Sequence, residues 1–426
     1  MNTKNNLQRW QPCRGYCQMN GAASAILSIK DAKVVMNCPR WCAVLAEREL
    51  AIAVKEYETR LYCSEVLETD LLFGVGDKLV DAVEEACADG RNSLLAVLTN
   101  CSMSLIGDDI KGVCSELKTD CPVVAIDSGG LTGEYWEGWS NALITILKNI
   151  QPQRLTTVPG TVNILGCSTC YPHWQGDLSE MKRLMQAAGV QVNVCLVENG
   201  TTLEQLGQIG SAQLNIVINE EIGLPIARYL EESLGLPFLD LPMPYGLEGS
   251  LRWLRKIGEA LKLDVDLSTL QEEVKWAKEM IFREYSVLKG ACDNLFFKRL
   301  VISSYYGKIS SLLPVLQEEM PVFGQLYYRI NGPHGILNLA GEEWRYTHPL
   351  EALQEDEYQI VLGSERDLHE LCGFKNTAFC EFMMPASRIS VPWETYVGIN
   401  GWLYFTKYVI YQILHLYKLN NGPSSK

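Results

Sequence analysis

Apolar and polar positions follow two periodicities along most of the chain. Short apolar runs rich in Val, Ile and Leu predict strands at 33–36, 94–99, 123–127, 162–165, 192–197, 214–218, 300–304 and 358–363. Amphipathic stretches of helical length lie between most of them, at 76–88, 135–148, 178–188, 224–234 and 247–261. This alternation of strand and helix predicts an α/β protein whose parallel sheets are flanked by helices.

The same pattern predicts three domains. Residues 1–155 form the first, and a Gln-Pro-Gln joint at 151–153 leads into the second, at 156–290. The charged stretch 270–289 predicts a long connecting helix, and residues 291–394 form the third domain. The last segment, 395–426, contains a helix at 401–416 that is apolar on much of its surface. We expect this helix to pack back on the first domain.

Composition and charge limit the partners and the compartment. The 426 residues carry a net charge of −14, which argues against nucleic acid or an anionic membrane as the main partner. No uncharged apolar run is long enough to span a membrane. The first residues lack the apolar core of a signal peptide, so we expect a cytoplasmic protein.

Cysteine is abundant, with 15 in the chain. In a cytoplasmic protein such a number indicates metal binding, redox chemistry or buried thiols. Several cysteines have apolar sequence neighbours and are expected to pack as small hydrophobic side chains; these are Cys63, Cys87, Cys114, Cys195, Cys292 and Cys372.

Three other cysteines, Cys17, Cys42 and Cys101, each lie where a loop meets a secondary-structure element. Cys42 follows a predicted strand and Pro39, and Cys101 directly ends the strand 94–99. Because the carboxyl ends of parallel strands share one edge of a sheet, thiolates from such loops can converge there. Thiolate is the ligand of iron–sulfur clusters. On spacing alone, buried core thiols are the ordinary alternative.

The segments around these cysteines resemble component 1 of nitrogenase and its relatives. The segments 17–22, 29–32, 39–43, 73–79 and 101–110 match that family in order and spacing. The later segments 127–133, 242–246 and 297–299 also match the family in order. The resemblance is greatest to the β-type subunits and implies three Rossmann-like domains.

By this resemblance, Cys17, Cys42 and Cys101 are the cluster cysteines that each subunit contributes at a subunit interface. The cluster is an eight-iron P-cluster (8Fe-7S) in nitrogenase. It is a four-iron cluster (4Fe-4S) in dark-operative protochlorophyllide reductase and the nickel-tetrapyrrole reductive cyclase. The implied partners are a paralogous or identical component 1 subunit and an ATP-dependent iron-protein reductase. Phe73 matches a residue of the reductase docking face, although a core aromatic is an equally ordinary reading.

The sequence agrees with the expectation that a separate reductase binds ATP, and it also departs from the family. It contains no Gly-x-x-x-x-Gly-Lys-[Ser/Thr] loop, so if ATP powers the electron flow, another protein must bind it. Asn219 stands where the α-type subunit has a cysteine for the iron–molybdenum cofactor, and no histidine lies between His369 and His415. We therefore expect no iron–molybdenum cofactor on this chain.

Other polar residues leave alternatives open. Cys13 and Cys38 each lie four residues before a candidate ligand. Each could supply a fourth ligand or could be a spare thiol. The lone pair Cys167 and Cys170 could be redox active or bind metal, which a single C-x-x-C indicates only weakly. His334 lies in a glycine-rich loop, and the acidic pair 220–221 follows a strand, where helix capping is the default.

The sequence thus predicts an electron-relay subunit of a nitrogenase-like oxidoreductase, with an iron–sulfur cluster held by Cys17, Cys42 and Cys101. One alternative is a scaffold of the same family, on which a metal cofactor is assembled without turnover. Another is a cluster-free binding protein of the same architecture. The sequence does not identify the substrate.

Overall fold

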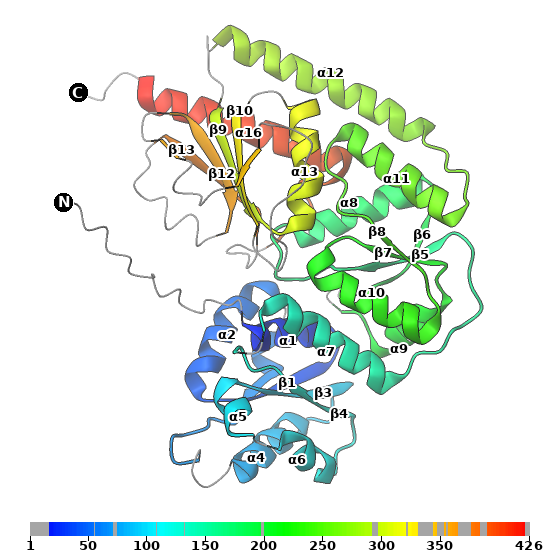
Figure 1. Ribbon diagram of the computed structural model, residues 1–426, viewed down its shortest axis with the longest axis vertical. Helices are drawn as coiled ribbons and strands as arrows, with labels where there is room; N and C mark the ends of the chain where they lie inside the picture. Colours follow the sequence, from blue (N-terminus) through cyan, green and yellow to red (C-terminus); the bar gives the residue numbers. More distant parts are fainter. Residues whose placement is uncertain are drawn as a thin grey trace, which may run out of the picture.

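The computed structural model describes most of the chain. The described residues are 17–54, 56–70, 75–107, 109–131, 133–196, 200–291, 297–320, 323–330, 344–346, 353–354, 357–364, 376–383 and 390–421. They form three parallel β-sheets, each flanked by helices, which confirms the predicted α/β class (Figure 1). The strands of the three sheets fall within 1–155, 156–290 and 291–394, respectively.

The first sheet has the strand order β2-β1-β3-β4 and lies at the bottom of Figure 1. Its strands are β1 (Ala32–Asn37), β2 (Leu61–Cys63), β3 (Leu94–Thr99) and β4 (Val123–Asp127). Its helices are α1 (Gln18–Leu27), α2 (Arg40–Ala53), α4 (Gly76–Cys87), α5 (Cys101–Ile106), α6 (Ile110–Glu116) and α7 (Tyr135–Ile150). The central strands β1 and β3 are fully buried, as their unbroken apolar runs require.

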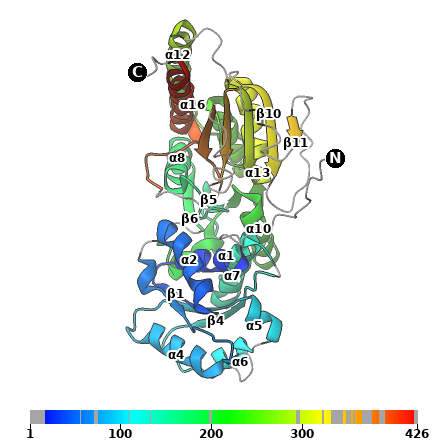
Figure 2. The ribbon, with the colours of Figure 1, turned by 90° about the vertical axis from the view of Figure 1, so that its left-hand side faces the viewer.

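The second sheet has the order β6-β5-β7-β8. Its strands are β5 (Thr161–Leu165), β6 (Gln191–Cys195), β7 (Leu214–Val217) and β8 (Phe238–Asp240). Its helices are α8 (Trp174–Ala187), α9 (Leu203–Gly207), α10 (Glu220–Leu234) and α11 (Leu247–Leu261). The first and second sheets are joined through helices, because α10 packs against α7 (Figures 1 and 2).

The third sheet has the order β11-β10-β9-β12-β13. Its strands are β9 (Phe297–Ser304), β10 (Phe323–Ile330), β11 (Trp344–Tyr346), β12 (Gln359–Gly363) and β13 (Thr377–Glu381). The helix α13 (Tyr306–Glu319) follows β9, and the long helix α12 (Ser268–Ala291) connects the second unit to the third. The predicted connecting helix is therefore present.

The last helix, α16 (Gly398–Asn421), corrects one expectation. It packs against α8, α11, α12 and β13, and it lies at the opposite end of the molecule from the first sheet (Figure 1). Carboxylates of α8 hold its first turn, because Asp177 accepts the Tyr396 N–H at 3.2 Å and Glu180 accepts the Asn400 N–H at 3.1 Å. The expected packing of 395–426 on the first domain is wrong, since helices of the second unit bury its apolar face.

The helices α1 and α7 make the closest helix contact in the first unit, and glycine permits it. A Cβ atom on Gly21 would collide with the backbone of Tyr135, and one on Gly138 would collide with the backbone of Gln18. Two facing glycines thus let the backbones touch. This contact fixes the start of α1, where Cys17 lies.

Candidate cluster-binding site

Each of the three predicted cysteines lies at the N-terminus of a helix. Cys17 is the residue before α1 and its carbonyl accepts the Gly21 N–H. Cys42 lies in the first turn of α2, and Cys101 is the first residue of α5. The positive end of each helix dipole therefore faces a thiol, which favours the thiolate form.

Two of these helices follow neighbouring strands. β1 and β3 pair in parallel with Asn37 opposite Thr99, so their carboxyl ends lead directly to α2 and α5. Asn100 joins the two ends. Its side-chain oxygen accepts the Met103 N–H at 3.0 Å and caps α5, while its Nδ2 atom donates to the Cys42 sulfur at 3.7 Å. The predicted shared edge of the sheet is therefore present.

Gly130, in the loop after β4, brings Cys17 to the same place. A Cβ atom built on Gly130 would lie 3.0 Å from Cys17 Cβ and 3.4 Å from Cys101 Sγ. Only the missing side chain of Gly130 leaves room between these two cysteines. Cys17, Cys42 and Cys101 are all partly buried, and the structure thus gathers the three predicted residues at one edge of the first sheet.

The surroundings of the thiols shift their acidity in different directions. Burial raises the pKa of Cys17 to about 11, with the nearby Glu49 carboxylate contributing. A hydrogen bond from Cys38 lowers the pKa of Cys42 to about 7, helped by Asn100. Cys38 itself is fully buried and retains its proton, because its hydrogen bonds to Cys42 and to Cys63 raise its pKa.

The donor set suits a cluster better than a single ion. Within the described ranges, no three His, Cys, Asp or Glu side chains form a group that could hold a metal ion. In an iron–sulfur cluster the protein thiolates bind different iron atoms, so their sulfurs lie further apart than around one ion. Cys17 and Cys101 beside Gly130, with Cys42 at the same sheet edge, fit such a group.

Large apolar side chains are exposed next to all three cysteines. On α2 these are Trp41, Val44 and Leu45; on α5 they are Leu105 and Ile106; beside Gly130 it is Leu131. Trp41 is 62% exposed, Leu105 74% and Leu131 70%. Exposed apolar patches of this kind mark protein–protein contact surfaces in soluble proteins.

The other candidate residues have structural partners or lie outside the described residues. Asn219 is fully buried, and its Nδ2 atom donates to the carbonyl oxygen of Gly166 at 2.7 Å. Cys167 and Cys170 are buried where the second unit meets α1, close to Tyr135. Several predicted positions lie outside the described residues; these are Cys13, Phe73, Cys292, His334 and Cys372.

Sequence reasoning missed a buried charged group where the first and second units meet the third. Lys308, on the first turn of α13, is only 3% exposed and lies 4.7 Å from the Tyr171 ring and 5.1 Å from the Phe382 ring. Asp177 and Glu221 are buried near it, and burial raises the pKa of Asp177 to about 6 and of Glu221 to about 7. The sequence analysis named Glu221 only as one of the acidic pair 220–221 and did not link it to Lys308 or Asp177, because the three residues come from separate helices.

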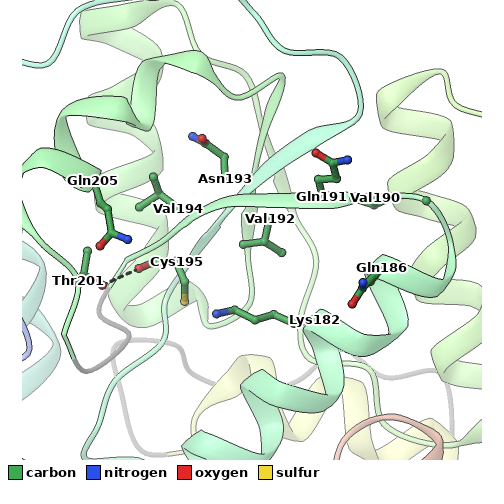
Figure 3. A pocket seen from close by; sticks show the side chains of 11 residues that line it. Lys182, Gln186, Val190, Gln191, Val192, Asn193, Val194, Cys195, Thr201 and Gln205 are labelled. Carbon is green, nitrogen blue, oxygen red and sulfur yellow. Dashed lines mark hydrogen bonds between the residues drawn. The ribbon is translucent and has the colours of Figure 1, made fainter.

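A pocket of about 590 Å³ lies along β6, at the edge of the second sheet (Figure 3). Lys182 and Gln186 of α8 line one side, and Asn193 and Cys195 of β6 line the other. Figure 3 shows the Lys182 side chain extending toward the Cys195 sulfur. None of the three predicted cysteines lines this pocket, so it is separate from the candidate cluster site.

Comparison with known families identifies the chain. The model of the nitrogenase component 1 type oxidoreductase family matches residues 17–329, which is most of the sequence. The chain belongs to this family. The match begins at Cys17 and includes all three gathered cysteines. No described helix is both long and apolar enough to cross a membrane.

Several similar curated proteins are subunits of light-independent protochlorophyllide reductase. The B-type subunit of light-independent protochlorophyllide reductase from a Nostoc species is 25% identical over 317 residues, covering 71% of this chain and 61% of that protein. The same subunit of Huperzia lucidula is 26% identical over 268 residues, covering 58% of this chain and 52% of that protein. The chain thus spans roughly three fifths of the length of the curated relatives it matches first.

Solved nitrogenase structures share the fold. The structure "Nitrogenase Cp1 at pH 6.5" superposes with a TM-score of 0.75 at 18% identity, covering 97% of this chain and 94% of that one. A second structure, at pH 5, gives a TM-score of 0.71 at the same identity and covers 91% of that chain. At this identity the likeness shows the three-domain architecture alone.

Proposed function

We propose that this chain is an electron-relay subunit of a nitrogenase-like oxidoreductase. Cys17, Cys42 and Cys101 would hold an iron–sulfur cluster, of the 4Fe-4S or 8Fe-7S type, at the edge of the first sheet. When bound, such a cluster accepts and donates single electrons. An ATP-dependent iron-protein reductase would supply the electrons, and a second component 1 subunit, paralogous or identical, would complete the site.

The observation that carries this proposal is the approach of Cys17 and Cys101 at Gly130, with Cys42 held at the same sheet edge by Asn100, each cysteine lying at a helix N-terminus. Helix dipoles favour the thiolates that iron requires. Asn100 donates to the Cys42 sulfur, and hydrogen bonds of this kind to ligand sulfurs set the potential of a cluster.

The exposed apolar residues support the second subunit. Trp41 directly precedes Cys42, and Leu105 lies one helical turn after Cys101. A partner that covers these side chains would also exclude water from the cysteines and could add thiolates of its own. Subunit contact and cluster binding would then depend on one surface.

The test is iron binding by anaerobically purified protein, co-expressed with its partner subunit. We expect Cys17→Ser, Cys42→Ser and Cys101→Ser to lose most of the iron and the absorption near 400 nm that the unaltered protein shows. Cys114→Ser is the matched control, because Cys114 is buried in a separate core cluster with Leu79 and Val83 and should leave the iron content unchanged.

The outcomes separate the three functions. Iron bound through these cysteines, together with substrate reduction that needs the reductase and ATP, supports the relay. Iron without turnover, but with a metal cofactor that transfers to another protein, would favour the assembly scaffold. A protein isolated anaerobically without iron refutes the proposal and leaves a cluster-free binding protein.

A further inference from the structure

A pair of thiols outside the set Cys17, Cys42 and Cys101 lies close to Cys42. The sulfur atoms of Cys38 and Cys63 are 3.7 Å apart. Cys38 follows β1, and Cys63 is the last residue of the neighbouring strand β2. The pair is formed by residues 25 positions apart in the sequence, which only the strand pairing brings together.

The backbone holds the two thiols in this position. β1 and β2 pair in parallel with Met36 opposite Cys63, and the ladder continues past both strand ends. There the Val66 N–H donates to the Cys38 carbonyl oxygen at 3.1 Å. A disulfide needs a sulfur separation of about 2 Å, so side-chain rotation must close the remaining gap of less than 2 Å.

The two thiols differ in accessibility. Cys38 is fully buried, whereas Cys63 is partly exposed. The Cys63 sulfur accepts the Glu65 N–H at 3.4 Å, a contact that stabilises a thiolate. The Arg40 guanidinium pairs with the Glu65 carboxylate, two residues after Cys63, at 3.4 Å. Cys63 is therefore placed to react first with a dissolved reagent, and Cys38 is placed to resolve the product.

We propose that Cys38 and Cys63 are a redox-active dithiol that a low-molecular-weight disulfide oxidises to an intramolecular disulfide. The Cys63 thiolate attacks one sulfur of the small disulfide, and one small thiol leaves. Cys38 then attacks the Cys63 sulfur and gives its proton to the second small thiolate, which leaves as a thiol. The two protein thiols lose two electrons and two protons, and the small disulfide gains them.

Oxidation would also alter the candidate cluster site, although the reaction itself does not depend on a bound cluster. The Cys38 thiol is close to Cys42 as well as to Cys63. A disulfide would remove the Cys38 S–H group from the surroundings of Cys42. The redox state of the surrounding small thiols would thereby change the environment of Cys42, which the proposed function assigns as an iron ligand.

The test is disulfide mapping of the full chain after anaerobic incubation with oxidised glutathione. Trypsin separates the relevant cysteines, because Cys38 lies in peptide 34–40, Cys42 in 41–48 and Cys63 in 61–78. After remaining thiols are blocked with N-ethylmaleimide, we expect a cross-link between peptides 34–40 and 61–78. We also expect Cys63 to lose its free thiol at least about tenfold faster than the buried Cys114.

Variants assign the order of attack. Cys38→Ser should stop the reaction at a mixed disulfide of glutathione on Cys63, and Cys63→Ser should leave Cys38 reduced. Cys114→Ser should form the cross-link like the unaltered chain. A cross-link between 34–40 and 41–48, a lasting mixed disulfide on Cys63 of the unaltered chain, or no reaction at Cys63 would each overturn the proposal.

Discussion

The contact between α1 and α7 gives a direct test of how Cys17 is positioned. In Gly21→Ala the added methyl group would collide with the carbonyl oxygen of Tyr135 in the facing helix. The methyl carbon is bonded directly to the α1 backbone and the oxygen belongs to the α7 backbone, so no side-chain rotation can relieve the clash. The helices must separate instead, and the contacts of α1 with α7, the most extensive between any two elements, must adjust.

The cost can be worked from this geometry. Inserting one methyl group into a well-packed interior usually costs about 1–3 kcal/mol. A clash between two backbones belongs at the upper end of that range, so we expect the free energy of unfolding to fall by about 3 kcal/mol. Because α1 begins directly after Cys17, the separation should also lower the iron content of protein isolated anaerobically.

The assay is urea unfolding followed by far-ultraviolet circular dichroism, with Gly207→Ala as the matched control. Gly207 is also helical, but a methyl group there meets nothing within 4 Å. Its substitution should be neutral or stabilise by up to about 1 kcal/mol. If Gly21→Ala and Gly207→Ala unfold at the same urea concentration, the contact between α1 and α7 does not require glycine at position 21, and the reasoning is refuted.

Three further predictions follow from single contacts. Gly130→Ala should lower iron binding without unfolding the chain, because its Cβ would enter the space beside Cys17 and Cys101; unchanged iron per chain would show that this space is not used. Burial raises the pKa of Glu221 from 4.5 to about 7, so the unaltered protein should lose about 2–3 kcal/mol of stability as pH rises through that window. Glu221→Gln should remove this dependence in urea titrations at pH 5 and pH 8, and an equal slope in both proteins would contradict the assignment. Glu319→Ala should cost about 1–2 kcal/mol in thermal unfolding, because its carboxylate accepts the first N–H groups of α11, whereas Glu318→Ala removes only an exposed ion pair and should cost less than about 1 kcal/mol.

The sequence predicted the fully buried strands of the first two sheets but missed two short edge strands. The runs 94–99 and 162–165 coincide with β3 and with most of β5, because unbroken apolar runs are typical of strands buried on both faces. The short strands β2 and β8 were not predicted. Each lies at the edge of its sheet, is three residues long and is only partly buried, so its side chains carry no clear pattern.

Helix positions were predicted well where one face is apolar. The predicted helix 247–261 matches α11 at both ends, because its apolar residues recur at helical spacing. The predicted helix 224–234 began too late, since α10 starts at Glu220 and contains Pro225 in its second turn. The position of α16 was wrong for a different reason. An apolar face shows that a helix is buried, but not which helices cover it.

In the candidate site, some residues are brought together by the order of the strands and others only by the packing of helices and loops. Cys42 and Cys101 follow adjacent parallel strands, so their proximity follows from topology that the sequence predicts. Cys17 reaches them only through the glycine contacts of α1 with α7 and the gap at Gly130, which no pattern of hydrophobicity records. The pairing of Cys38 with Cys63 depends on the register of an edge strand that was not predicted at all. Residues on a predicted shared edge can thus be assigned from sequence, whereas thiols that meet through an unpredicted neighbour strand require the structure.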